Sequence, residues 1–117
     1  MRLVEIKKLV SGTADPAFAL DAHGVIAAWN TAAVELFGFR AADAIGKTCN
    51  EIVRGIDECG RECSKDCNVQ HQVRIGQPLK SYDIQIRSNG RPQWVSVSIM
   101  IVEGTRSTQG YSIHIVR

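Results

Sequence analysis

The sequence predicts an α+β domain in which short helices pack on one face of a five-stranded antiparallel sheet. The predicted elements follow the order helix, two strands, four short helices and three strands, which is typical of one sheet with helices segregated to one side. The C-terminal third of the chain alternates apolar and polar residues with the period of half-buried strands. Glycine, asparagine and aspartate stand where turns and helix caps need them.

Length and composition indicate one folded domain. A chain of 117 residues is long enough for one hydrophobic core and too short for two. With 44% hydrophobic and 22% charged residues it has the composition of a globular protein rather than a disordered one. We expect residues 1–117 to form a single domain, with residues 1–12 as an N-terminal helix or flank and residues 13–117 as the core.

Charge and hydropathy argue against nucleic acid or a membrane as direct partners. The formal net charge is +2, and no stretch gathers five basic residues. No apolar run approaches the roughly 20 residues of a membrane helix, and Glu5, Lys7 and Lys8 interrupt the stretch where a signal peptide would be apolar. We therefore expect a cytoplasmic protein.

The residue pattern in the first half of the chain predicts a helix, a hairpin and a second helix. Leu3, Ile6, Leu9 and Val10 fall on one side of a short amphipathic helix. Two apolar runs, residues 17–20 and 25–29, flank a turn at Gly24. Asn30 is placed to cap a helix over residues 31–37, which Gly38 ends.

Two short helices, a loop and a longer helix follow. Residues 41–45 form a helical turn, and Thr48 with Glu51 has the spacing of a capping box for residues 49–53. Residues 54–66 hold two glycines and few large apolar side chains, so we expect mostly loop. Asp66 is placed to cap a helix that runs through Ile75.

The residue pattern in the rest of the chain predicts three strands. Residues 82–87, 94–101 and 111–115 alternate apolar and polar side chains. Asn89-Gly90 lies between the first two of these runs and is a strong signal for a tight hairpin turn. The alternation predicts that Trp94 and Met100 lie on the outer surface of the sheet.

Several short motifs together resemble a PAS domain. They are Asp15-Pro16, Asp21-Ala22-His23-Gly24-Val25-Ile26, Trp29-Asn30, Ala32-Ala33, Leu36-Phe37-Gly38-Phe39 and Ile45-Gly46-Lys47, and they span nearly the whole chain. The resemblance implies a five-stranded antiparallel sheet that cradles short helices, with a pocket between them. It also implies a sensory module, since members of this family sense small ligands, cofactors, redox state or protein partners and are rarely enzymes.

The cysteine-bearing segment 54–67 resembles PAS modules that precede LuxR-type helix-turn-helix domains in bacterial transcription regulators. That resemblance implies a covalently attached output domain outside this chain. A homodimer is expected because the short apolar stripe of the N-terminal helix needs a cover. Arg40 departs from the family pattern, which often has Ser or Thr at that position.

A candidate ligand pocket follows from the predicted elements. Aromatic residues make up 6% of the chain, so few large side chains are available to fill the interior, which favours a small apolar cavity over a fully packed core. The predicted wall comprises Phe37, Ile52, Val53, Ile56 and Val73 from the helical half, and Tyr82, Ile84, Val97, Ile99 and Ile113 from the strands.

The four cysteines suggest an alternative function as a redox or metal switch. In a reducing cytosol they are free thiols, redox partners or metal ligands. Cys49 and Cys67 would begin helices, where thiolates are stabilised. The spacing of four that relates Cys59, Cys63, Cys67 and His71 would suit a metal site on one continuous helix, but the segment contains Gly60 and lacks a CxxC motif.

Bound cofactors are not expected. Residues 46–50 resemble the flavin-adduct motif of LOV-type PAS domains, but Asn50 and Glu51 replace its arginine and its large apolar residue. His71 lies where haem-binding PAS domains place an axial histidine, yet its polar neighbours Gln70 and Gln72 favour a solvated side chain. The cysteines of this chain lack the spacing that usually binds an iron–sulfur cluster. A ligand-free dimerisation module that uses the N-terminal helix is a further alternative.

Overall fold

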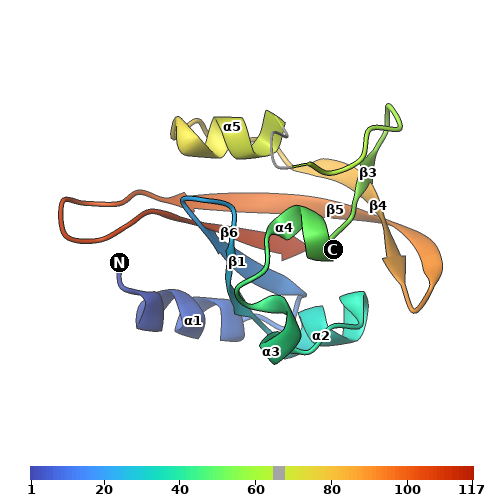
Figure 1. Cartoon of the computed structure of the whole chain (residues 1–117), viewed down its shortest axis with the longest axis horizontal. Helices are drawn as coiled ribbons and strands as arrows, with labels where there is room; N and C mark the ends of the chain where they lie inside the picture. The colour runs from blue at the N-terminus through green and yellow to red at the C-terminus, as the bar shows by residue number, and fades with distance from the viewer. Residues whose placement is uncertain (65–67) are drawn as a thin grey trace.

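The computed structural model describes residues 1–64 and 68–117. Within these residues lies a six-stranded antiparallel sheet with the order β2-β1-β6-β5-β4-β3 (Figure 1). The strands are β1 (Ala17–Asp21), β2 (Ile26–Trp29), β3 (Ile56–Asp57), β4 (Tyr82–Ser88), β5 (Arg91–Val102) and β6 (Tyr111–Val116). The helices are α1 (Leu3–Ser11), α2 (Thr31–Phe37), α3 (Ala41–Ala44), α4 (Cys49–Ile52) and α5 (Asn68–Arg74).

The sheet has an apolar cluster on each of its two faces. We call the face that carries Phe18, Leu20 and Val97 the inner face; α2, α3 and α4 pack there, and their buried side chains belong to the same cluster. The outer face carries Ala19 and Ile113 and is partly covered by α1. Because side chains alternate along a strand, each strand contributes to both clusters or to one cluster and solvent.

Helix α1 packs on the outer face through two residues one helical turn apart. Ile6 and Val10 are 0% and 1% exposed, and they lie against small residues of β1 and β2. Leu3 and Leu9, which the sequence placed on the same stripe, are 39% and 49% exposed because they flank this contact. The predicted amphipathic helix is therefore present, with a narrower buried side than expected.

Asn30 joins four parts of the chain. As predicted, its Oδ1 caps α2 by accepting from the N–H of Ala33 at 2.9 Å, and it also accepts from the N–H of Ala17 at 3.0 Å. Its Nδ2 donates to three carbonyl oxygens at the end of α1 and in the following linker. These belong to Val10 (3.0 Å), Thr13 (3.4 Å) and Asp15 (2.9 Å).

The sixth strand, β3, was not predicted. The sequence assigned residues 54–66 to a loop, but Ile56 and Asp57 pair with β4 opposite Gln85 and Ile84. A strand of two residues is too short to show alternating polarity, which is the main sequence signal for a strand. The predicted α+β arrangement is otherwise confirmed.

The predicted hairpin turn between β4 and β5 is confirmed. Asn89 and Gly90 have positive φ angles of 52° and 78°, the left-handed conformation that a tight two-residue turn requires. In the described part of the chain, no helix is long and apolar enough to cross a membrane.

Candidate functional site

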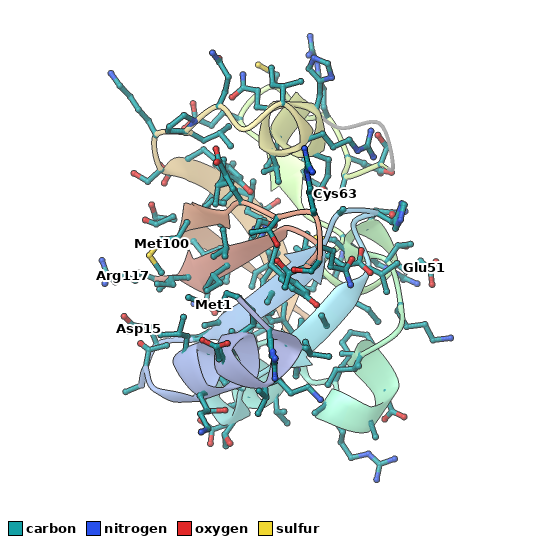
Figure 2. All side chains as sticks on the ribbon, turned by 90° about the vertical axis from the view of Figure 1, so that its left-hand side faces the viewer. Met1, Asp15, Glu51, Cys63, Met100 and Arg117 are labelled. Atoms are coloured by element: carbon teal, nitrogen blue, oxygen red, sulfur yellow. The ribbon has the colours of Figure 1, made fainter. Side chains whose placement is uncertain are left out.

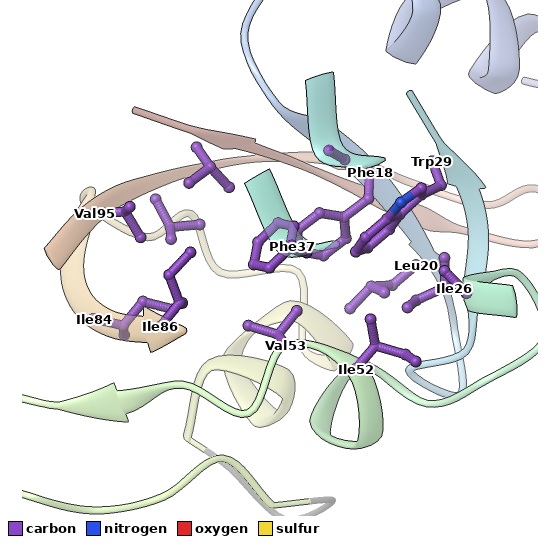
Figure 3. Packing of buried hydrophobic residues seen from close by; sticks show 14 residues of the cluster. Phe18, Leu20, Ile26, Trp29, Phe37, Ile52, Val53, Ile84, Ile86 and Val95 are labelled. Atoms are coloured by element: carbon purple, nitrogen blue, oxygen red, sulfur yellow. The ribbon is translucent and has the colours of Figure 1, made fainter. Parts of the chain in front are cut away.

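Aromatic side chains fill one end of the inner face (Figure 3). The ring centroid of Phe18 lies 5.4 Å from that of Trp29 and 6.1 Å from that of Phe37, and Trp29 and Phe37 are 5.2 Å apart. The Trp29 indole Nε1 donates a 3.0 Å hydrogen bond to the carbonyl of Phe39. Aromatic pairs at these distances attract one another, so this end of the interior is closely packed.

The other end of the inner face is aliphatic. Figure 3 places Ile84, Ile86 and Val95 together on β4 and β5, apart from Trp29. Seven of the ten predicted wall residues belong to one cluster or pack against it. Phe37, Ile52, Val53, Ile84 and Val97 are buried members, Tyr82 and Ile99 are half-buried against it, and Ile56 and Val73 are half-buried elsewhere.

The prediction for Ile113 is wrong. It lies on the outer face of β6, in the cluster that α1 covers, and it pairs with Ala19 and Met100. The alternation along this strand was the ground for placing Ile113 in the pocket. Because α1 supplies an apolar cover for the outer face as well, apolarity does not distinguish the two faces of this strand.

The inner face of β6 carries a buried polar pair, Ser112 and His114, that sequence reasoning missed. These residues are 1% and 2% exposed, and the Ser112 Oγ lies 2.9 Å from the His114 Nε2. The imidazole stacks on Phe18, with centroids 4.9 Å apart and planes inclined by 11°. Burial lowers the pKa of His114 from 6.5 to about 3, so the ring is neutral at neutral pH.

Helix α5 lies across the end of the sheet that contains Ser112. A Cβ placed on Gly24, in the turn after β1, would lie 3.5 Å from the Gln70 Oε1 of α5. A Cβ placed on Gly76, just after α5, would lie 3.6 Å from the Glu103 Oε1, just after β5. Both β1 and β5 pair with β6 beside Ser112 before they end. In Figures 1 and 2, α5 lies on the opposite side of β5 and β6 from α1. Because α1 covers the outer face of β6, α5 lies on the inner side of these two strands.

Apolar residues in the region of α5 are less buried than those at the aromatic end. Val69 and Val73 of α5 are half-buried, and so are Ile99 and Ile101, which the alternation along β5 places on the inner face. Solvent therefore reaches part of the apolar interior near α5. Asp66, the predicted cap of this helix, lies outside the described residues.

A cavity of about 290 Å³ lies elsewhere, between the end of α1 and the start of α2. Its walls combine hydroxyl, carboxylate and methyl groups, whereas the predicted pocket is apolar. It is lined by Ser11, Thr13, Ala14, Asn30, Thr31, Ala32 and Glu35, none of which belongs to the predicted wall.

Three of the four cysteines, Cys49, Cys59 and Cys63, are described, and no disulfide joins any two of them. Cys49 begins α4 and packs against the inner cluster, and Cys59 is exposed after β3. Cys63 is half-buried, with its N–H donating to the Gly55 carbonyl at 2.8 Å. Cys67 lies outside the described residues, and oxidative coupling of any pair stays a prediction.

The metal alternative gains no geometric support from the residues that the structure places. Among them, no three His, Cys, Asp or Glu side chains gather closely enough to hold an ion. Cys59 and Cys63 precede α5, and His71 is exposed on that helix, so these three do not share one continuous helix.

The predicted cap of α4 differs in detail. Thr48 is the N-cap, but its hydroxyl donates to the Glu51 carboxylate at 2.8 Å instead of accepting from a backbone N–H. The carboxylate thus lies in the first turn of the helix that Cys49 begins.

The fold and the site define a PAS domain. A family model described as the PAS fold matches residues 5–111, and the chain therefore belongs to this family.

Solved structures have the same fold. The PAS domain of BvgS from Bordetella pertussis has a TM-score of 0.66 and 17% identity, covering 98% of this chain and 83% of that chain. A PAS domain from a two-component sensor histidine kinase has a TM-score of 0.68 and 16% identity, covering 97% and 93%. The PAS domain of nitrogen regulation protein NR(II) from Vibrio parahaemolyticus has a TM-score of 0.61 and 16% identity, covering 96% and 95%. At such identities the likeness concerns the fold alone.

A curated relative is similar over part of the chain. Phytochrome C of Arabidopsis thaliana is 43% identical over 49 residues, which are 42% of this chain and 4% of that protein. The chain thus spans a small part of this relative, and the similarity is that of a segment.

Proposed function

We propose that this PAS domain is a sensory binding module and not an enzyme. It takes a small, largely apolar molecule between α5 and the inner face of the sheet, and it needs no bound cofactor. The observation that carries this proposal is the contrast within the interior. Aromatic rings pack closely at one end, whereas Val73, Ile99 and Ile101 are half-buried in the region of α5.

Burial of apolar surface supplies the driving force for binding. Complete burial of an aliphatic side chain stabilises by roughly 1.5–3 kcal/mol relative to exposure. A ligand that covers the remaining exposed parts of Ile99, Ile101 and Val73 gains a share of this free energy. It also contacts α5, whose two ends lie beside the turns after β1 and β5, and thereby alters the position of that helix.

The signal has a route to an output domain through β6. The Val116 N–H donates to the Pro16 carbonyl at 2.8 Å, and the Arg117 Nε lies 3.0 Å from the Asp15 Oδ2. A change at Ser112 on the inner face of β6 therefore acts on a strand whose end is tied to the linker after α1. The proposed output is a DNA-binding domain of the LuxR type in a longer cytoplasmic regulator.

An environment-sensitive dye tests the pocket. N-phenyl-1-naphthylamine fluoresces strongly in apolar surroundings, and we expect the wild-type domain to bind it. Ile99→Trp should abolish binding because the larger ring fills the space on the inner face. Ile115→Trp, on the outer face of the neighbouring strand, is the matched control and should bind the dye normally. Equal fluorescence from both variants would place the dye elsewhere and refute the pocket.

A second role, self-association through the outer face, is favoured by two exposed apolar side chains. Trp94 and Met100 of β5 are 54% and 50% exposed, on the part of the sheet beside the α1 contact (Figure 2 labels Met100). Large apolar side chains exposed on one face are typical of a protein interface. We propose that the domain is a homodimer when it transmits the effect of ligand binding to the output domain.

A further inference from the structure

We infer that the Ser112–His114 pair binds one uncharged polar group, a hydroxyl or a carbonyl, on an otherwise apolar ligand. This inference rests on the proposed function, because it assigns ligand chemistry to the same pocket. The geometry that carries it is a hydrogen-bonded polar pair, 2.9 Å apart, in the middle of an apolar sheet face.

The pair is surrounded by apolar neighbours on both sides. β6 lies between β1 and β5, so each member of the pair has one partner residue on each adjoining strand. The partners of Ser112 are Leu20 and Ile101, and those of His114 are Phe18 and Ile99. On the β1 side these neighbours are buried, and on the β5 side they are half-buried. We therefore expect a ligand that enters beneath α5 to lie against the half-buried Ile99 and Ile101 of β5. From there it contacts the pair on the adjacent strand.

The chemistry of the pair leaves it able to make another hydrogen bond. A neutral imidazole and a hydroxyl each carry one polar hydrogen, and their mutual bond uses one of the two. In either tautomer, the pair keeps one donor and additional acceptor capacity. A ligand hydroxyl both donates and accepts, and a carbonyl accepts, so both groups match.

The electrostatics of the pair favour an uncharged group. Because the pKa of His114 is lowered to about 3 by burial, the pair carries no positive charge at neutral pH. A carboxylate brought to this position would be a buried charge without an opposite charge in the pair, which is strongly unfavourable. An alcohol or a ketone needs only the hydrogen bond.

Two matched probes, indane and 1-indanol, test the inference by isothermal titration calorimetry. They share one carbon skeleton and differ by a hydroxyl. A wholly apolar site would favour indane by roughly tenfold, because burying an unpaired hydroxyl is costly. We expect the wild-type domain to bind 1-indanol at least as tightly as indane. In Ser112→Ala, we expect 1-indanol to bind about tenfold more weakly, while binding of indane is unchanged.

Ser98→Ala is the control, because it removes a hydroxyl from the outer face of β5 and should leave both affinities unchanged. Circular dichroism at the titration temperature verifies that Ser112→Ala is folded, and the wild-type preference provides a test that needs no variant. Binding of both probes with a tenfold preference for indane would overturn the inference and leave the apolar pocket standing. The inference would also be overturned, with the apolar pocket left standing, if Ser112→Ala bound 1-indanol and indane with the same relative affinity as the wild type. Binding of neither probe would overturn the pocket itself.

Discussion

His114 makes the stability of the domain depend on pH. Its pKa is about 3 in the folded chain, where burial disfavours the charged ring, against 6.5 for an exposed histidine. Above pH 6.5 the ring is neutral in both states, so it contributes no pH dependence. Below that pH the unfolded chain binds a proton that the folded chain does not. Stability is therefore lost at about 1.4 kcal/mol per pH unit, until the pH approaches about 3.

Urea unfolding at pH 7 and pH 5 measures this effect. We expect the wild-type domain to lose about 2 kcal/mol from this residue between the two values. His114→Phe keeps an aromatic ring on Phe18 and should remove that loss, whereas His71→Gln, at an exposed position, should retain it. An equal pH dependence in wild type and His114→Phe would show that His114 is not a buried neutral ring.

Asn30 should be more important for stability than an ordinary helix cap. Loss of a cap alone costs about 1 kcal/mol. Asn30→Ala removes five hydrogen bonds and leaves the buried carbonyl of Val10 and the buried N–H of Ala17 without this partner, so we expect a cost of about 3 kcal/mol. Asn50→Ala on α4 is the control, with an expected change of about 1 kcal/mol or less. Chemical denaturation compares the two, and equal midpoints would argue against the role of Asn30.

At the level of elements, α1 has one side that stabilises the domain and another that is exposed. Ile6 is fully buried against the outer face, so Ile6→Ala should cost about 2–4 kcal/mol in the free energy of unfolding. Leu9 is about half exposed on the same helix, so Leu9→Ala should lower the free energy of unfolding by less than about 1 kcal/mol. Thermal unfolding of the two variants tests this. Similar losses would mean that the helix does not dock through Ile6.

Elements with a strong local signal could be predicted from the sequence. The cap at Asn30 and the turn at Asn89-Gly90 depend on residues close in the chain, and both are confirmed. The inner faces of β4 and β5 could be predicted too, because their outer faces are polar or exposed.

The orientation of β6 could not be predicted, because α1 and the inner helices cover both of its faces. Its alternating pattern placed Ile113 in the pocket, whereas the structure places Ser112 and His114 on that face. The signal that could have corrected this is the amphipathic N-terminal helix, which needs an apolar surface to pack on. Strand β3 lacked a signal because its pairing with β4 is set by residues distant in sequence.

For the whole molecule, the exposed outer face predicts self-association. If Trp94 and Met100 lie in a dimer interface, the double variant with Trp94→Ser and Met100→Ser should be monomeric at concentrations where the wild type is dimeric. Ile75→Ser, at a residue that follows α5 and is 58% exposed, is the control for the loss of a surface apolar side chain. Analytical ultracentrifugation gives the mass distribution. A monomeric wild type, or a dimeric double variant, would exclude this interface.

The central claim is that the interior between α5 and the inner face takes a small, largely apolar molecule. The most direct measurement is NMR spectroscopy of the domain with labelled isoleucine methyl groups and bound 1-indanol. Ile99 and Ile101 lie on the inner face, and Ile113 and Ile115 lie on the outer face of the adjacent strand. We predict nuclear Overhauser effects from 1-indanol to the methyl groups of Ile99 and Ile101 and none to those of Ile113 and Ile115. Contacts confined to the outer pair, or no contacts with the inner pair, would contradict the claim.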